Sequence, residues 1–193
     1  MTTAAPRRPL STALVVETAG RIADERGIDA LTLTTVAKEL GTSQPALYRH
    51  VDSFDDLLRS LGLQARELLA KRLMAAAVGV AGEDAVRAVG YAWREMVAEH
   101  PGLYAATDRY PCAGDPELEA AVEEVVNTLQ LALADFGLSL DRRVHVARTM
   151  RSAFHGFSHL EAGDGHPREQ DLDESFDQLI DLLCIGIRSS ETA

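Results

Sequence analysis

The sequence predicts an all-α fold of about nine helices. Apolar residues recur at helical spacing along almost the whole chain of 193 residues, and no stretch alternates with period two for long enough to form a strand. Glycine, proline and clusters of polar residues interrupt this pattern, as is typical of helix ends. A chain of this length can hold one large domain, or a small domain joined to a larger one.

The first quarter of the sequence is predicted to form a short arm followed by three helices. Residues 1–9, which contain two prolines and two arginines, are expected to form a flexible arm. A first helix begins at Ser11 and ends at Gly27, and a second ends at Gly41, since glycine readily adopts the backbone conformation that closes a helix. The three predicted helices cover about 11–26, 34–40 and 41–51, and the domain that they form covers 1–52.

The second predicted domain, 53–193, begins with a long helix. Ser53 is followed by Asp55 and Asp56, which is typical of a helix start. The serine can cap the first amide groups, and acidic side chains favour the positive end of the helix dipole. We therefore expect Ser53 to begin a helix that runs to about residue 77.

Turn-forming residues divide the rest of this domain. Residues 79–82 separate the long helix from the next, and the run His100-Pro101-Gly102 is expected to end that next helix, with only one helical turn after it. Polar connectors follow at 107–116 and 163–170. The remaining predicted helices cover about 83–99, 103–106, 117–136, 141–162 and 172–188.

The charge of the chain is unevenly distributed. The formal net charge is −11 at pH 7, which taken alone argues against a nucleic-acid partner, because Lys and Arg dominate binding to phosphates. Residues 1–52, however, carry six basic and six acidic side chains, whereas 53–193 carry 13 basic and 24 acidic ones. An anionic partner is therefore expected only at the first domain.

The cysteine content and hydropathy point to a cytoplasmic protein. Cys112 and Cys184 lie far apart in sequence, so neither a disulfide framework nor a paired zinc-binding motif is expected. No run of about 18 apolar residues occurs, and the first 30 residues lack the order of a secretory signal. We expect a protein that stays in the reducing cytosol and contacts no membrane.

The stretch 41–51, GTSQPALYRHV, favours a helix-turn-helix motif. Its glycine permits a sharp turn, and Pro45 suits a first helical turn, where its missing N–H would have no partner. The second helix of such a motif enters the DNA major groove by its N-terminal residues. Gln44 can bond an adenine edge, whereas Tyr48 and His50 can reach phosphate oxygens.

Residues 31–51, LTLTTVAKELGTSQPALYRHV, resemble the DNA-binding signature of the TetR-type transcriptional regulators. The shared pattern is a threonine-led helix containing alanine, then a glycine, then a helix that ends in Leu-Tyr-x-His. The resemblance implies an N-terminal three-helix helix-turn-helix domain, a C-terminal helical ligand-binding and dimerisation domain, and double-stranded operator DNA as a partner. By this likeness the residues at the DNA are Thr32, Thr34, Thr42, Ser43, Gln44, Pro45, Ala46, Tyr48, Arg49 and His50.

The sequence departs from the family pattern at two cationic positions. Phe54 stands where the family usually has a phosphate-binding lysine, and Thr34 replaces an arginine of the second helix. Losing two cations is expected to weaken non-specific DNA affinity and its dependence on salt. Arg7 and Arg8 of the arm are candidates to replace them, with the minor groove as their target.

Two stretches of the second domain, 91–104 (YAWREMVAEHPGLY) and 154–163 (FHGFSHLEAG), resemble the ligand-binding and dimerisation domain of a large TetR subgroup. This likeness implies a homodimer formed by the last two long helices and a small apolar or aromatic effector in a cavity. The abundance of acidic residues favours a neutral or cationic effector. The predicted ligand contacts are Trp93, Met96, His100, Tyr104, Tyr110, Phe154 and Phe157. The predicted dimerisation residues are Phe176, Leu179, Ile180, Leu183 and Ile187.

The leading hypothesis is a homodimeric repressor that leaves a palindromic operator when the effector binds. A protein-binding adaptor with a degenerate helix-turn-helix is an alternative, as is a redox sensor based on Cys112. A metal sensor is another, because His155 and His159 are four residues apart with Glu161 close by. No Gly-rich phosphate loop, nucleophile elbow or metal triad occurs, so we expect no enzyme, no cofactor and no metal.

Overall fold

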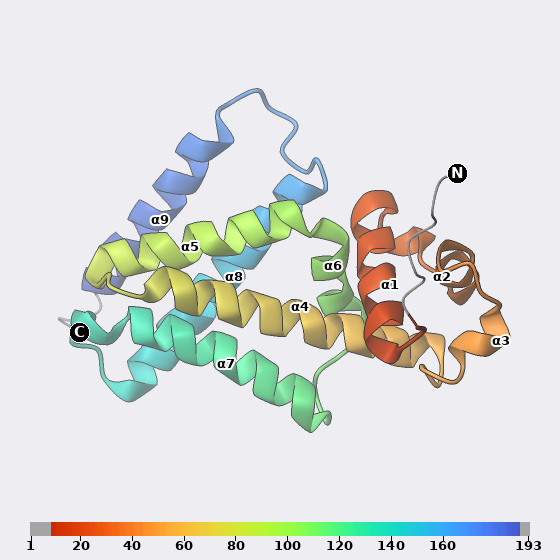
Figure 1. The fold of residues 1–193 in the computed structure, drawn as a ribbon. Coiled ribbons are helices and arrows are strands. Elements are labelled where there is room, and N and C mark those ends of the chain that lie inside the picture. Colours follow the sequence, from red (N-terminus) through yellow and green to blue (C-terminus); the bar gives the residue numbers. More distant parts are fainter. Residues whose placement is uncertain (1–8, 190–193) are drawn as a thin grey trace.

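The structure is a computed structural model in which residues 9–189 are described. All regular secondary structure in this range is helical, which confirms the predicted all-α fold of nine helices (Figure 1). The predicted arm, with Arg7 and Arg8, lies outside the described residues except for its last position. The elements are α1 (Thr12–Arg26), η1 (Ile28–Ala30), α2 (Leu33–Glu39), α3 (Gln44–Leu47), α4 (Phe54–Ala77), α5 (Gly82–Glu99), α6 (Pro101–Arg109), α7 (Pro116–Ala132), η2 (Ala134–Phe136), α8 (Leu140–Ala162) and α9 (Leu172–Ser189).

Local capping sets the ends of the first helices. The Ser11 hydroxyl accepts a hydrogen bond from the Leu14 amide at the start of α1, and Gly27 closes the helix with a φ of 83°. At the start of α2, Thr32 and Thr35 form a reciprocal capping box, in which each side chain accepts a hydrogen bond from the other residue's amide. Side-chain caps thus fix where both helices begin.

The long helix α4 runs through the middle of the molecule (Figure 1). Ser53 caps it as predicted, accepting a hydrogen bond from the Asp56 amide at 3.0 Å. From the end of α3 the helix extends across the C-terminal region, where α5, α6 and α7 pack against it. The helix α8 contacts α5 and α7, and α9 contacts α5 and α8. One continuous hydrophobic core runs from Val15 in α1 to Ile187 in α9.

The junction between α5 and α6 differs from the prediction. His100 ends α5, but Pro101 and Gly102 begin α6 directly, and this helix continues to Arg109 instead of forming a single turn. Proline is favourable at a first helical position, because it lacks the N–H that would have no partner there. The prediction that Pro101 and Gly102 only terminate a helix was wrong, since a proline after one helix can equally begin the next.

Two other helices are shorter than the periodicity predicts. The third helix was expected across 41–51, but regular α-helix covers only α3. The chain then tightens, with the Arg49 and His50 amides bonded to carbonyls three residues earlier. The seventh predicted helix ends at Ala132, and η2 follows it.

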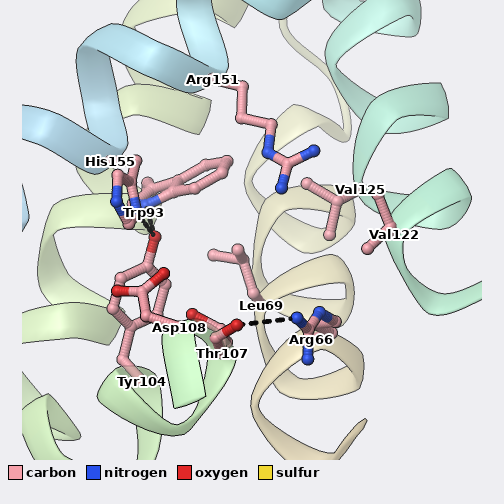
Figure 2. Close-up of a pocket in the computed structure, with 10 residues that line it drawn as sticks. All are labelled: Arg66, Leu69, Trp93, Tyr104, Thr107, Asp108, Val122, Val125, Arg151 and His155. Atoms are coloured by element: carbon pink, nitrogen blue, oxygen red, sulfur yellow. Dashed lines mark hydrogen bonds between the residues drawn. The ribbon is translucent and has the colours of Figure 1, made fainter. Parts of the chain in front are cut away.

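The C-terminal helices enclose a cavity of about 150 Å³ between α4, α5, α6, α7 and α8 (Figure 2). None of the helices in the described part of the chain is long and apolar enough to cross a membrane.

Candidate functional site

The ten residues predicted at the DNA all lie on α2, α3 or the segments beside them, and each is at least partly exposed. Tyr48 is the most exposed large apolar side chain of this region, with 50% of its surface accessible. Leu47 and Val51, in contrast, are buried in the core. The second helix is therefore held from inside by two apolar side chains, while its outer residues are presented to solvent.

The turn between α2 and α3 is held by backbone hydrogen bonds. Gly41 has a φ of 62°, a left-handed conformation that favours glycine. The Gly41 amide donates to the Lys38 carbonyl at 3.1 Å, and the Thr42 amide donates to the Ala37 carbonyl at 2.9 Å. These bonds satisfy the last carbonyls of α2 and fix the direction in which the chain enters α3.

A side-chain hydrogen bond links the two helices at the predicted reading residue. The Thr34 hydroxyl donates to the Gln44 Oε1 atom at 3.2 Å. The amide oxygen of Gln44 has a second lone pair, and the amide nitrogen keeps both its hydrogens. Gln44 can therefore still form hydrogen bonds with both polar groups on the major-groove edge of an adenine. Thr34, which replaces a cation of the family pattern, thus positions Gln44.

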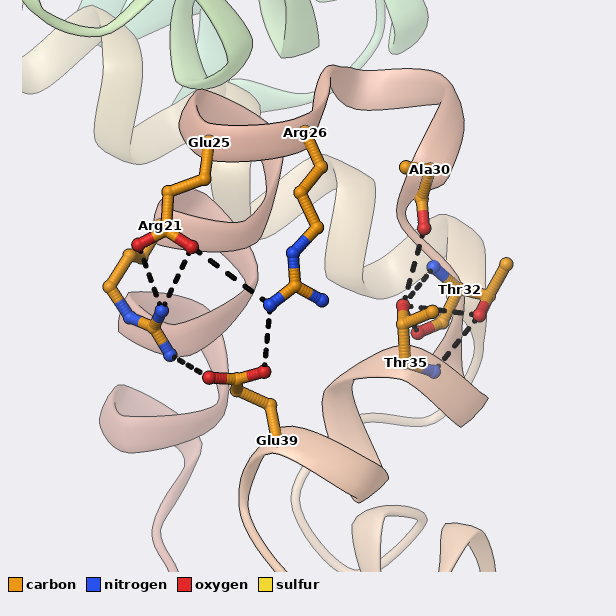
Figure 3. A network of polar contacts seen from close by, with 7 residues as sticks. All are labelled: Arg21, Glu25, Arg26, Ala30, Thr32, Thr35 and Glu39. Carbon is orange, nitrogen blue, oxygen red and sulfur yellow. Dashed lines mark hydrogen bonds and ion pairs between the residues drawn. The ribbon is translucent and has the colours of Figure 1, made fainter.

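Two of the four basic side chains in residues 9–52 form ion pairs within the protein. Glu39 at the end of α2 accepts hydrogen bonds from Arg21 at 2.8 Å and from Arg26 at 3.1 Å, and Arg21 also binds Glu25 (Figure 3). This exposed network orients α2 on α1. Within residues 9–52, Lys38 and Arg49 remain without an ion pair, and both are exposed.

Phe54 has a packing function at the position where the family usually has lysine. Its side chain is half-buried and packs against the hydrophobic core, where it lines a small pocket with Ile28, Leu31 and Leu58. The aromatic ring therefore fastens the start of α4 to the segment around η1. This explains structurally why the chain can carry an apolar residue at this position.

The cavity in the C-terminal region combines an apolar wall with several polar groups (Figure 2). Two of the seven predicted ligand contacts, Trp93 and Tyr104, line it. The eight further lining residues, which the sequence analysis did not assign to a ligand cavity, are Arg66, Leu69, Thr107, Asp108, Val122, Val125, Arg151 and His155.

A chain of hydrogen bonds crosses one wall of the cavity. The Trp93 Nε1–H group donates to Tyr104 Oη at 3.1 Å, and Tyr104 Oη lies 2.7 Å from His155 Nδ1. The tyrosine hydroxyl is thus free to donate to Nδ1, which assigns the imidazole proton to Nε2. Burial raises the pKa of Tyr104 and lowers that of His155. Both groups are accordingly neutral near pH 7.

The other five predicted ligand contacts lie outside the cavity lining. Met96 and Phe154 are fully buried in the core, and Phe157 packs against the ring of Phe176 at 4.9 Å between centroids. His100 binds Asp24 of α1, while the carbonyl oxygen of Tyr110 lies 3.5 Å from Arg66. Met96, Phe154 and Phe157 thus contribute to packing in this structure.

The predicted dimerisation residues form an apolar stripe on α9 that faces largely toward the core of its own chain. Phe176, Ile180 and Ile187 are buried in the core of a single chain, whereas Leu179 and Leu183 are partly buried. The buried members of this set have little accessible surface for a partner. Other apolar side chains on α9 are exposed: 68% of the Leu182 surface and 52% of the Ile185 surface are accessible.

The histidine pair and the cysteines suggested a metal sensor or a redox sensor as alternatives. His155 and His159 stack with ring centroids 5.6 Å apart. Among the described residues, no group of three or more His, Cys, Asp or Glu side chains is arranged to hold a metal ion. Cys112 is partly exposed and unpaired, and Cys184 is buried.

The exposed helix-turn-helix, joined to a larger helical domain, is typical of DNA-binding proteins of the helix-turn-helix class. Known families agree: residues 15–61 match the bacterial regulatory proteins of the tetR family, and residues 86–183 match the tetracyclin repressor-like C-terminal domain. An uncharacterised HTH-type transcriptional regulator of Mycobacterium tuberculosis, Rv0681, is 34% identical over 95% of this chain and 84% of its own length. The chain belongs to the TetR family of DNA-binding transcriptional regulators, which confirms the resemblance noted in the sequence.

Two solved structures have the same fold. BioQ in complex with its double-stranded DNA operator has a TM-score of 0.68 and 24% identity, with 94% of this chain and 99% of BioQ covered. ActR of Streptomyces coelicolor in complex with actinorhodin has a TM-score of 0.71 and 18% identity, with 96% of this chain and all of ActR covered.

Proposed function

We propose that this regulator is a homodimeric repressor that binds a palindromic operator and is released when a small molecule occupies the cavity. The observation that carries this proposal is that one helix, α6, both lines the cavity and anchors the helix-turn-helix domain. Tyr104, Thr107 and Asp108 of α6 face the cavity. The start of the same helix is fixed to α1.

The contact between α6 and α1 is close and polar. The Asp24 carboxylate accepts hydrogen bonds from the Leu103 amide at 2.7 Å and lies 2.9 Å from His100 Nδ1. A Cβ atom at Gly102 would lie only 1.9 Å from the Ala23 carbonyl oxygen, so the two backbones touch. A ligand that displaces α6 therefore acts directly on α1.

The long helix α4 supplies a second connection. Its first residues follow the end of the helix-turn-helix, and Arg66 and Leu69, about three turns further, line the cavity. An effector that favours one position of α4 and α6 would shift the population between two spacings of the DNA-binding domains. The operator-bound form of BioQ and the actinorhodin-bound form of ActR support the two partners, DNA and an effector.

The exposed side of α8 and α9 is the surface that we assign to the dimer. Leu182 and Ile185 are exposed on α9. Leu182 lines a groove of about 370 Å³ with Val146 and Thr149 of α8, and two of the predicted dimerisation residues, Leu183 and Ile187, line it as well. A dimer joined here would cover exposed apolar surface and present two recognition helices. Two such helices read half-sites about 34 Å apart in successive major grooves.

Gln44→Ala tests the assignment of the DNA-reading residue. Operator sequences are first selected from random DNA with the full chain, and binding to the operator and to single-base variants is then measured by gel shift. Gln44→Ala should lose about 1–3 kcal/mol of discrimination at one base pair in each half-site. The matched variant Gln64→Ala, at an exposed position of α4, should leave discrimination unchanged. Failure to select any specific operator contradicts the proposed function, and indifference to Gln44→Ala favours an adaptor.

Leu182→Glu tests the dimer surface. A charge introduced at this exposed apolar site should turn the dimer into a monomer, because its burial in an interface would be unfavourable, while the fold of each chain is retained. Analytical ultracentrifugation measures the mass, and circular dichroism checks helicity. The same substitution at Leu131, which is exposed on α7, is the control and should leave the dimer intact. A Leu182→Glu protein that remains dimeric would place the interface elsewhere.

A further inference from the structure

The cavity lining contains a buried cation that forms no ion pair with a carboxylate of the described residues. Arg66 of α4 retains only 7% of its accessible surface. Its hydrogen bonds within the described structure all go to backbone carbonyl oxygens, those of Gly62 at 2.9 Å, Thr107 at 2.9 Å and Tyr110 at 3.5 Å. Buried charged groups are normally paired with an opposite charge, because removing a charge from water is costly.

Other partly or largely buried arginines of this chain show the usual arrangement. Arg59, also on α4, binds Asp115 and Glu117, and Arg94 of α5 binds Glu161. Arg66 is more deeply buried than Arg59, and burial lowers its pKa. A deeply buried guanidinium without an acidic partner, on the wall of a cavity, is a ready partner for an anion from outside the chain.

A second guanidinium points into the same cavity. Arg151 extends from α8 into the space between α4, α7 and α8 (Figure 2) and forms no ion pair with any described residue. Of the lining residues, Asp108 is the one carboxylate, and it lies 3.9 Å from His159 Nδ1. With His155 neutral, the lining carries two positive charges and one negative charge. The cavity is thus positive inside a chain with a net charge of −11.

The polar side chains of the cavity lining are also suited to a ligand that accepts hydrogen bonds. The hydrogen bond from Trp93 to Tyr104 and the contact from Tyr104 to His155 leave the imidazole Nε2–H as a donor. Arginine side chains offer only donors. The two guanidinium groups of the lining therefore offer N–H donors to a ligand, and a carboxylate accepts from such donors through both of its oxygens.

The apolar wall and the volume limit the size of the ligand. Leu69, Trp93, Val122 and Val125 supply apolar surface on the other sides of the cavity. Its volume of about 150 Å³ is comparable to that of an engineered protein cavity that binds benzene. A single aromatic ring or a short aliphatic chain fits this space.

We propose that the effector is a small organic carboxylate, with its anionic group at Arg66 and Arg151 and one ring or short chain against the apolar wall. This inference rests on the proposed function, of which it specifies the ligand class. It reverses the expectation of a neutral or cationic effector, because the charge of the lining differs from that of the domain as a whole. The acidic residues of the domain are mostly elsewhere on its surface.

The test compares a carboxylate with a neutral molecule of the same shape. Benzoate, phenylacetate and hexanoate, with benzamide as the neutral control, are titrated into the full chain at millimolar concentrations, and binding is measured by calorimetry and by the shift in Tm. At least one carboxylate should bind, and benzoate should bind about tenfold more tightly than benzamide, as expected for a charge-assisted hydrogen bond. Equal binding of benzoate and benzamide, or no binding of any carboxylate, overturns the proposal.

Variants locate the binding site. Arg151→Gln should weaken binding of the carboxylate about tenfold or more and leave benzamide unaffected. Arg148→Gln, an exposed position one turn earlier on α8, should change neither. Unaltered carboxylate binding by Arg151→Gln overturns the assignment. Since these measurements need no DNA, failure of the ligand class is distinguishable from failure of operator binding, which is measured separately by operator selection.

Discussion

Gly102→Ala is expected to lower the free energy of unfolding by about 3 kcal/mol and to weaken operator binding at least about tenfold. An added Cβ would lie 1.9 Å from the Ala23 carbonyl oxygen and 2.5 Å from the Asp24 amide nitrogen. These are backbone atoms of α1 that cannot rotate away, so α6 and α1 must separate. The separation also breaks the hydrogen bond from the Leu103 amide to Asp24.

Thermal or urea unfolding measures the loss of stability, and gel shift at a temperature where the variant remains folded measures the loss of affinity. Gly20→Ala is the matched control, because the added Cβ would meet its nearest neighbours at an ordinary distance of 3.6 Å or more. This control should keep wild-type affinity and gain up to about 1 kcal/mol from helix propensity. If Gly102→Ala unfolds and binds DNA like wild type, α6 does not hold α1, and the proposed path from cavity to DNA loses its main support.

The helices of this fold could be predicted because their ends depend on local chemistry. Ser11, Thr32 and Ser53 each cap the helix that follows, and these short polar side chains are visible in the sequence. The start of α6 was missed for a tertiary reason. Gly102 in a first helical turn has low local propensity, but its position is determined by the close approach of α1, which no local pattern reveals.

The helix-turn-helix could be located for the same reason, since its chemistry lies within one short segment. The hydrogen bond between Thr34 and Gln44 was not predicted, because it depends on the angle between α2 and α3. The charge network around Glu39 was also missed. It joins α1 to α2, and the packing angle of two helices is set by side chains of the whole domain.

The cavity could be anticipated only in outline. Its lining comes from five helices, which are separate segments of the sequence. Of the aromatic residues predicted to contact the ligand, Trp93 and Tyr104 line the cavity, whereas Phe154 is buried in the core. One local signal was present: Arg66 lies at a core-facing position of α4, between Gly62 and Leu69, where apolar residues are expected. A charged residue at such a position indicates either a buried ion pair or a ligand, and only the structure shows that Arg66 forms no ion pair with a carboxylate of the described residues.

The dimer prediction came from the apolar stripe of α9. The apolar stripe of α9 is wide enough to suggest a partner helix, but α5 and α8 of the same chain cover Phe176 and Ile180. Leu182 and Ile185 are exposed on α9, and Leu182 lines the outer groove together with Leu183 and Ile187 of the stripe. The inner face of α9 is fixed to its own chain by Arg94, whose contacts decide where the outer face lies.

Arg94→Met is expected to destabilise the chain by about 3 kcal/mol. The guanidinium donates two hydrogen bonds to Glu161 at 2.6 and 2.7 Å and binds Asp173 at 2.7 Å, and it lies 5.0 Å from the Phe176 ring. Its side chain is only 11% exposed, and the hydrogen bonds that it donates to Glu161 raise its pKa, so it remains charged. Methionine retains the contact with the ring but leaves the Glu161 carboxylate, at the end of α8, without its partner.

The matched control is Arg87→Met, two turns earlier on α5. Arg87 also binds two carboxylates of α9, Asp177 and Asp181, but its side chain is 39% exposed, and exposed ion pairs contribute about 0–1 kcal/mol. Urea unfolding should therefore separate the variants by about 2 kcal/mol. The double variant Arg94→Met/Glu161→Leu should recover much of the loss, because it removes the unpaired charge together with its partner. Equal stability of the two single variants would show that the buried ion pairs of Arg94 contribute no more to the free energy of unfolding than the exposed ion pairs of Arg87. Apolar packing alone would then hold α9.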